Sequence, residues 1–139
     1  MGAPFGPGAS AFSGAAYVFA RQGNGAWSQQ AKLTAADGVS ADNFGLGLDL
    51  NGGTIAIGAE NHATSAGLNA GTVYLYRLNG GTWTQFAELT GSDVAAGGGF
   101  GLSVELKNGT LAVGAPGQHP QPDHNPLYPE GEAYVYRVN

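Results

Sequence analysis

Apolar and polar residues alternate with a period of two along several short segments of the chain. Between residues 100 and 106 the apolar positions are Phe100, Leu102, Val104 and Leu106, and small or polar residues fill the positions between them. Residues 44–50 follow the same order. Because successive side chains of an extended strand point to opposite faces of a sheet, both segments are predicted to be β-strands.

A full repeat is predicted to contain three further strands after the first, and two of them follow residues 100–106. Residues 54–59 and 110–115 are nearly all small or β-branched, which is typical of a strand buried on both faces. The links before them, NGG and KNG, predict tight hairpins because Asn and Gly accept positive φ. The third strand reads AYVF, VYLY or AYVY, and the fourth reads WSQQAKLT or WTQFAELT.

Most of this pattern is repeated along the chain with a step of 56 residues, whereas the third strands follow one another after 57 and 60 residues. The pairs Phe44 and Phe100, Gly58 and Gly114, Trp27 and Trp83, Leu33 and Leu89, and Asp37 and Asp93 are each 56 residues apart. Four antiparallel strands at this period predict an all-β fold of four-stranded β-propeller blades. A β-sandwich is the alternative, but it does not account for the regular period.

The repeats in the chain do not complete a ring. The chain is expected to form one propeller segment, with a partial blade at 1–43, a full blade at 44–99 and a partial blade at 100–139. A propeller ring needs at least about four blades. The ring is therefore predicted to be incomplete, and its open strand edges are possible sites of self-association.

Composition and charge narrow the classes of partner. The 139 residues include 25 glycines and carry a net charge of −5. The five basic residues are scattered, so no nucleic acid partner is expected. The absence of cysteine excludes disulfides, thiolate catalysis and cysteine zinc sites.

The sequence predicts neither a membrane span nor a signal peptide. No apolar run reaches the roughly 20 residues of a membrane span, so none is expected. The opening MGAPFGPGAS lacks the charged start and the apolar centre of a signal peptide. These features indicate either a cytoplasmic protein or an internal piece of a longer exported chain.

Residues 100–116, FGLSVELKNGTLAVGAP, place FG at the start of the first strand and GAP at the end of the second. This motif resembles the FG-GAP repeat of integrin α-chains and of many bacterial surface and secreted proteins. GEAYVYRV and WSQQAKLTAADGVSADNFG resemble the bacterial form, and the similarity covers essentially the whole chain. The resemblance implies a β-propeller in a secreted or cell-surface protein, with a role in adhesion or recognition.

Many members of that family carry a calcium loop of the DxDxDG type between the first two strands. Here the corresponding turns are DLNGGT and ELKNGT, in which Asp49 and Glu105 each stand alone. The family's calcium site is therefore not expected in this chain. No metal and no other cofactor is assigned.

The long links, between the second and third strands and from the fourth strand to the next blade, are expected at one end of the blades, where ligands usually bind. The candidate ligand-binding residues on these links are His62, His119, Asp123, His124 and Tyr128. The segment HPQPDH offers nitrogen and oxygen ligands to a divalent metal. A proline-stiffened surface loop whose polar residues face water is the favoured interpretation, because one loop supplies no fixed geometry.

Other polar and aromatic residues on the repeats have two interpretations. Asp37, Asp42 and Asp93 are expected to cap turns, and the alternative is that they surround a cation or a ligand. Trp27 and Trp83 are expected to pack between strands, and the alternative is stacking on sugars. Tyr17, Tyr74 and Tyr134 are expected in the blade core, and Glu60 is an acid without a visible partner.

Catalysis has little support in the sequence. No serine lies in a GxSxG context, and no glycine-rich turn leads into a helix that could hold a phosphate. The chain is expected to be a non-enzymatic module that binds a protein or glycan ligand through the long-loop end. The alternatives are a lectin-like carbohydrate-binding module and a purely structural segment of a larger protein.

Overall fold

The fold is all-β. The computed structural model describes residues 1–117 and 131–138, and this part of the chain contains no helix. The strands are β1 (Gly2–Ala3), β2 (Ala15–Arg21), β3 (Trp27–Leu33), β4 (Leu48–Asn51), β5 (Thr54–Ala59), β6 (Thr72–Asn79), β7 (Thr82–Leu89), β8 (Ser103–Lys107), β9 (Thr110–Ala115) and β10 (Glu132–Arg137). No helix of the described residues could therefore cross a membrane.

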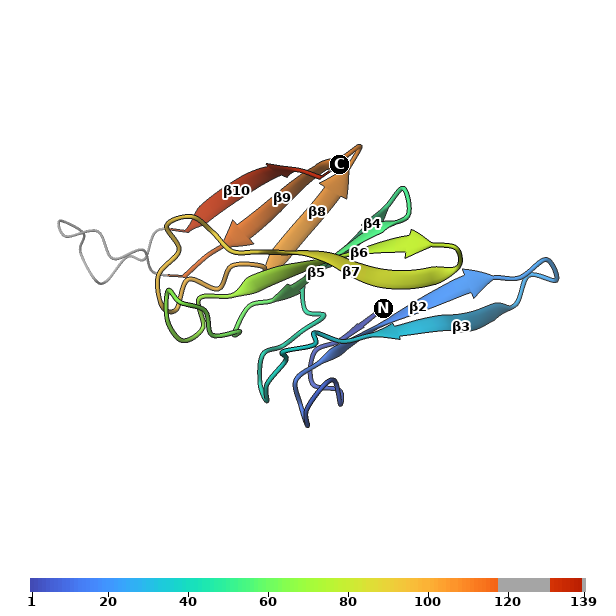
Figure 1. Ribbon diagram of the computed structural model, residues 1–139, viewed down its shortest axis with the longest axis horizontal. Helices are drawn as coiled ribbons and strands as arrows, with labels where there is room; N and C mark the ends of the chain where they lie inside the picture. Colours follow the sequence, from blue (N-terminus) through green and yellow to red (C-terminus); the bar gives the residue numbers. More distant parts are fainter. Residues whose placement is uncertain (118–130, 139) are drawn as a thin grey trace.

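The strands form three antiparallel sheets that follow one another along the chain (Figure 1). Their orders are β1-β2-β3, β4-β5-β6-β7 and β10-β9-β8. Each sheet connects sequential neighbours, as propeller blades do. The predicted fold of antiparallel blades in an incomplete ring is confirmed.

The hairpin predictions are confirmed by the backbone. Asn51 pairs with Thr54 across a two-residue turn in which Gly52 and Gly53 both have positive φ. Between β8 and β9, Lys107 pairs with Thr110 across a two-residue turn in which Asn108 and Gly109 both have positive φ. Both turns have positive φ at both central residues, which suits the twist of the strands they join.

The predicted start of the first strand of each blade is wrong by three or four residues. Phe44 and Phe100 lie before β4 and β8, in turns closed by backbone hydrogen bonds such as Leu46 N–H to Asn43 O (3.1 Å). Gly45 has a φ of 98° in this turn, so the chain bends before it pairs. The strict alternation of apolar faces is broken as a result, and Leu46 is exposed.

Two apolar cores separate the three sheets. The first interface, between β1-β2-β3 and β4-β5-β6-β7, has at its centre Ala16, Leu33, Ala35, Phe44, Ile55, Ile57, Ala59, Tyr74 and Tyr76. The second interface, between the middle sheet and β10-β9-β8, has at its centre Ala56, Val73, Leu75, Phe100, Leu106, Leu111, Val113 and Ala115. Strand β5 contributes alternate residues to both cores, which confirms its prediction as a strand buried on both faces.

The repeated FG and GA glycines meet across the interfaces. A Cβ on Gly58 would lie 1.9 Å from the carbonyl oxygen of Gly101, and a Cβ on Gly2 would lie 1.9 Å from that of Gly45. These separations leave no space for any side chain. The glycine that closes the second strand of one blade therefore allows close contact with the FG turn of the next blade.

Candidate functional site

The long links between strands lie at one end of the molecule, and the tight hairpins lie at the opposite end (Figure 1). Backbone hydrogen bonds join neighbouring links, for example Ala41 N–H to Phe12 O and Gly99 N–H to Asn69 O, both 3.0 Å. Residues 4–14, 34–47, 60–71 and 90–102 form this surface, which we call the loop end. Its links are thus held against one another rather than separated.

His62 is the centre of a polar cluster at the loop end. Its residue surface is only 9% exposed, and its Nδ1 lies 2.8 Å from Oδ2 of the buried Asp42. The backbone fixes the position of the ring, because the His62 N–H donates to Ala59 O and the His62 carbonyl accepts from Gly71 N–H. His62 therefore lies in the first interface and not in a solvated loop.

Asp42 is held as firmly as the histidine. Its Oδ2 also accepts the backbone N–H of Val39 at 2.7 Å, which closes a tight turn between the two residues. An ionised carboxylate accepts hydrogen bonds only, so the Nδ1 atom of His62 must carry the hydrogen. The tautomer of His62 is thereby fixed, and its Nε2 faces the other side of the cluster.

Two further carboxylates lie on that other side. Oδ2 of Asp37 is 3.5 Å from Nε2 of His62, and Oδ1 of Asp37 accepts a hydrogen bond from the Tyr74 hydroxyl at 2.9 Å. Glu88 on β7 completes the group, because one ligand atom each from Asp37, His62 and Glu88 lie within 4.8 Å of one another. Asp37 and Glu88 are exposed, so solvent reaches this side of the buried imidazole.

Burial and charge act together on the ionisable groups of the cluster. Burial raises the pKa of Tyr74 above its ordinary value, and the Asp37 carboxylate adds to this effect. Burial also raises the pKa of Glu88, with a further contribution from Asp37 and an opposing one from His62. Tyr74 thus remains a neutral donor to Asp37, and Glu88 faces a carboxylate of the same charge.

The structure gives hydrogen-bond partners for the three repeated acids. Asp42 caps a turn, as expected, but it also binds His62. Oδ1 of Asp37 accepts a hydrogen bond from the hydroxyl of Tyr74 in the next blade and caps no turn among the described residues. Oδ1 of Asp93 accepts one from the hydroxyl of Tyr134 in the next blade. The capping prediction is therefore wrong for Asp37, which joins two blades instead, and it stays a prediction for Asp93.

Other predicted residues have varied outcomes. Glu60 does have a partner, since Asn43 Nδ2 donates to it at 3.2 Å. His119, Asp123, His124 and Tyr128 lie outside the described residues, so their role as ligand-binding residues stays a prediction. Glu88 was not predicted as a site residue. It stands where the preceding unit has Lys32, and this reversal of charge at a repeated position could have pointed to it.

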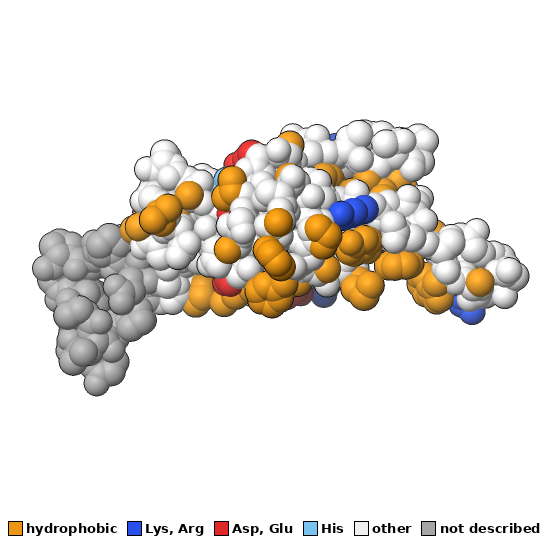
Figure 2. All heavy atoms as spheres, turned by 90° about the horizontal axis from the view of Figure 1, so that it is seen from below, with side chains coloured by type: hydrophobic (Ala, Val, Ile, Leu, Met, Phe, Trp, Pro, Cys, Tyr) orange, Lys and Arg blue, Asp and Glu red, His pale blue; other side chains and the backbone are white. Residues whose placement is uncertain are grey.

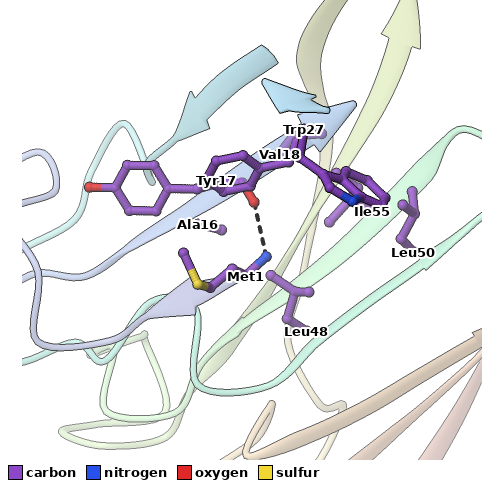
Figure 3. A pocket seen from close by; sticks show the side chains of 9 residues that line it. Met1, Ala16, Tyr17, Val18, Trp27, Leu48, Leu50 and Ile55 are labelled. Carbon is purple, nitrogen blue, oxygen red and sulfur yellow. Dashed lines mark hydrogen bonds between the residues drawn. The ribbon is translucent and has the colours of Figure 1, made fainter. Parts of the chain in front are cut away.

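The aromatic positions do not behave alike. Trp83 is half-buried against the first core, where its Nε1 donates to Gln30 Oε1, so its packing prediction is confirmed. Trp27 is 66% exposed and lies at the mouth of a groove of about 230 Å³, so its packing prediction is wrong. The Tyr17 ring points away from this groove and is half-buried (Figure 3).

The groove beside Trp27 is apolar. It is lined by Met1, Ala16, Tyr17, Val18, Phe19, Trp27, Leu48, Leu50 and Ile55, which come from the first two sheets (Figure 3). The only hydrogen bond drawn there joins the backbone of Met1 to Tyr17 O. A sugar needs polar partners for its hydroxyls, so these side chains do not favour a carbohydrate site.

The comparison with protein families gives a match over most of the chain. The family model described as FG-GAP repeat matches residues 27–76 and residues 83–136. The two matched segments start at equivalent tryptophan positions, one repeat apart. No curated protein matches the chain.

Proposed function

Because the chain belongs to the FG-GAP repeat family, we propose that it is a non-enzymatic module that binds a protein ligand through its loop end. The family resemblance also supports a place in a secreted or cell-surface protein, with a role in adhesion or recognition. The scaffold supports such a module, since repeated glycines and aromatics hold the blades while the links differ from blade to blade.

The observation that carries the proposal is the exposure of large apolar side chains on those links. Phe5, Phe12, Val39 and Leu68 are each more than half exposed and all belong to the loop end. Figure 2 shows apolar side chains at several places on one face of the molecule. Exposed apolar groups among polar ones are typical of surfaces that bind proteins.

Binding is tested against a panel of purified extracellular-matrix proteins and against a glycan array, with the whole chain immobilised. We expect at least one matrix protein to bind, and we expect the glycan array to stay blank. Leu68→Asp, at the loop end, should lower that affinity about tenfold or more. Leu78→Asp, near a hairpin of the opposite end, is the matched control and should leave the affinity unchanged.

Two results would contradict the proposal. Binding to glycans that depends on Trp27 would favour the lectin-like alternative. Binding that Leu78→Asp weakens as much as Leu68→Asp would show that the loop end is not the contact surface.

A further inference from the structure

We propose that Asp37, His62 and Glu88 form a binding site for a divalent transition metal ion, with zinc as the ion that the ligands fit best. The site would lie at the loop end, between the first and second blades, and it is separate from the hairpins that carry calcium in related repeats. The proposal goes beyond the interaction function and does not depend on it.

The first argument is the orientation of the imidazole. Nδ1 of His62 donates to Asp42, so a neutral ring directs the lone pair of Nε2 toward Asp37 and Glu88. In protein metal sites the ligating histidine commonly gives its other N–H to a carboxylate, which fixes the tautomer and makes the ring a better ligand. The buried Asp42 supplies that partner.

The second argument is the state of Asp37. Its Oδ1 is occupied by the Tyr74 hydroxyl, and its Oδ2 is directed at Nε2 of His62. Carboxylates that ligate metals are themselves hydrogen-bonded in this manner, because the bond holds one oxygen toward the ion. Two of the three candidate ligands are thus positioned by neighbours, Asp42 and Tyr74, that are not themselves proposed as ligands.

The third argument is distance. The 3.5 Å between Nε2 of His62 and Oδ2 of Asp37 is too long for a good hydrogen bond. Ligands of a tetrahedral zinc ion, each about 2.1 Å from the metal, lie about 3.4 Å apart. The observed separation therefore suits two ligands of one ion better than a direct pair.

Glu88 supplies the third ligand and the second negative charge. Its carboxylate lies within 4.8 Å of the other two ligand atoms, and it is exposed, so a rotamer change can bring it to the ion. A cation between two carboxylates that face each other offsets the repulsion between their negative charges. Three protein ligands would leave a fourth position for water or for a ligand group.

Two neighbours in this cluster, Asp42 and Glu88, are replaced at the equivalent positions of other repeats. In the second interface Asp93 still accepts from Tyr134, but Gly98 stands at the position of Asp42. In the first blade Lys32 stands at the position of Glu88, and its Nζ donates to Pro7 O. Within residues 1–117 and 131–138, the group of Asp37, His62 and Glu88 therefore belongs to the first interface.

Zinc binding by the whole chain is tested by isothermal titration calorimetry after removal of metals by chelation. The titrated species is zinc chloride, and calcium chloride is the comparison because calcium prefers oxygen ligands only. We expect one zinc ion per chain and much weaker calcium binding. Because His119 and His124 are also potential ligands, the double variant His119→Asn/His124→Asn is titrated as well and should keep this zinc ion.

Matched variants locate the ion. Asp37→Asn and Glu88→Gln should each lower the zinc affinity at least tenfold, and both side chains are exposed, so the fold should survive. Asp93→Asn removes the equivalent acid of the second interface, and Glu105→Gln removes an exposed strand glutamate. Neither control should change the affinity.

Three results would overturn the proposal. One is no heat of zinc binding by the native chain. Another is loss of the ion in the His119→Asn/His124→Asn variant. The third is equal zinc affinity in Asp37→Asn, Glu88→Gln and Asp93→Asn, which would leave His62 as an imidazolium paired with two carboxylates.

Discussion

The two interfaces between blades repeat the same contacts on different residues. Phe44 lies 5.5 Å from Tyr74 and 6.3 Å from Tyr76 between ring centroids, and Phe100 lies 5.2 Å from Tyr134 and 6.1 Å from Tyr136. In each case the second tyrosine donates to the carbonyl of a threonine in the preceding blade, Thr34 or Thr90. The repeated residues of the sequence are thus those that dock one blade on the next.

The two interfaces differ in their polar residues at the loop end. The first buries His62 against Asp42 at the loop end, whereas the second has Gly98 in place of the aspartate. A Cβ on Gly98 would lie 2.6 Å from a side-chain methyl of Val94, so an acid there would require Val94 to shift. Packing is common to both interfaces, and the pair of His62 with Asp42 belongs to the first.

The largest expected effect comes from the phenylalanine of the FG motif. Phe44→Ala and Phe100→Ala should each lower the free energy of unfolding by about 4 kcal/mol, because both rings are fully buried. Urea denaturation of the two variants measures this loss. Phe86→Ala, which removes an exposed ring beside Arg77, is the control and should cost less than about 1 kcal/mol.

This pair of variants tests whether the interfaces are equivalent. If Phe100→Ala cost no more than the control, the third sheet would be packed only loosely and the likeness between the interfaces would fail.

The glycines of the GA motif come next. Gly58→Ala should lower the free energy of unfolding by about 3 kcal/mol, because the new methyl would meet the rigid carbonyl of Gly101. Gly114 occupies the same repeat position, but there a Cβ would meet only the hydroxyl of Ser103, 2.4 Å away, which can rotate. Gly114→Ala should therefore cost less than about 1 kcal/mol.

Chemical denaturation of the two alanine variants makes the comparison. Equal losses would show that the cost comes from the strand itself and not from the blade that packs on it.

Removal of the buried histidine should have a moderate effect. In the absence of metal, His62→Ala should lower the free energy of unfolding by about 2 kcal/mol, since it leaves the buried Asp42 carboxylate without one of its two donors. The double variant His62→Ala/Asp42→Asn should recover part of this loss, because it removes the uncompensated charge. Denaturation in the presence of a chelator measures the free energy of unfolding of the single and double variants. If the loss in the double variant equalled the sum of the losses in His62→Ala and Asp42→Asn, the pairing of the two side chains would be contradicted.

The repeated part of the fold could be predicted from the sequence because a repeat constrains every copy in the same way. The hairpins at Gly52–Gly53 and at Asn108–Gly109, and the doubly buried strand β5, follow from local chemistry and from the period. The start of the first strand could not, because Phe44 alternates like a strand residue. Its backbone N–H instead donates to Ser13 O of the neighbouring blade, a contact that no local pattern contains.

The candidate site was harder to predict than the fold because it depends on contacts between residues that are distant in the sequence. His62, Asp37 and Glu88 come from a link between strands, from a link between blades and from an outer strand, so only the packed sheets bring them together. Asp49 shows the same limit, since its carboxylate accepts the backbone N–H of Leu106 in the next blade at 2.6 Å. The sequence signal for such site residues was a change of residue type at equivalent repeat positions. Glu88, which stands where the preceding repeat has Lys32, is one example.

The smallest expected effect concerns the tyrosine that donates to Asp37. Tyr74→Phe should lower the free energy of unfolding near neutral pH by about 1 kcal/mol, because it removes one hydrogen bond whose acceptor can turn to water. Tyr134→Phe is the matched variant of the second interface, where the hydroxyl donates to both Asp93 and Glu132. Denaturation at neutral pH gives the two losses.

The same two variants predict a dependence on alkaline pH. Burial raises the pKa of Tyr74 in the folded chain, whereas a tyrosine of the unfolded chain ionises near pH 10. Above about pH 10 the unfolded state therefore binds fewer protons than the folded state, so the stability should fall as the pH rises. Tyr74→Phe should make this fall less steep between about pH 9 and pH 11. Tyr134 also has a raised pKa, so Tyr134→Phe should make the fall less steep in the same range, and an unchanged slope in Tyr74→Phe would contradict the buried donor.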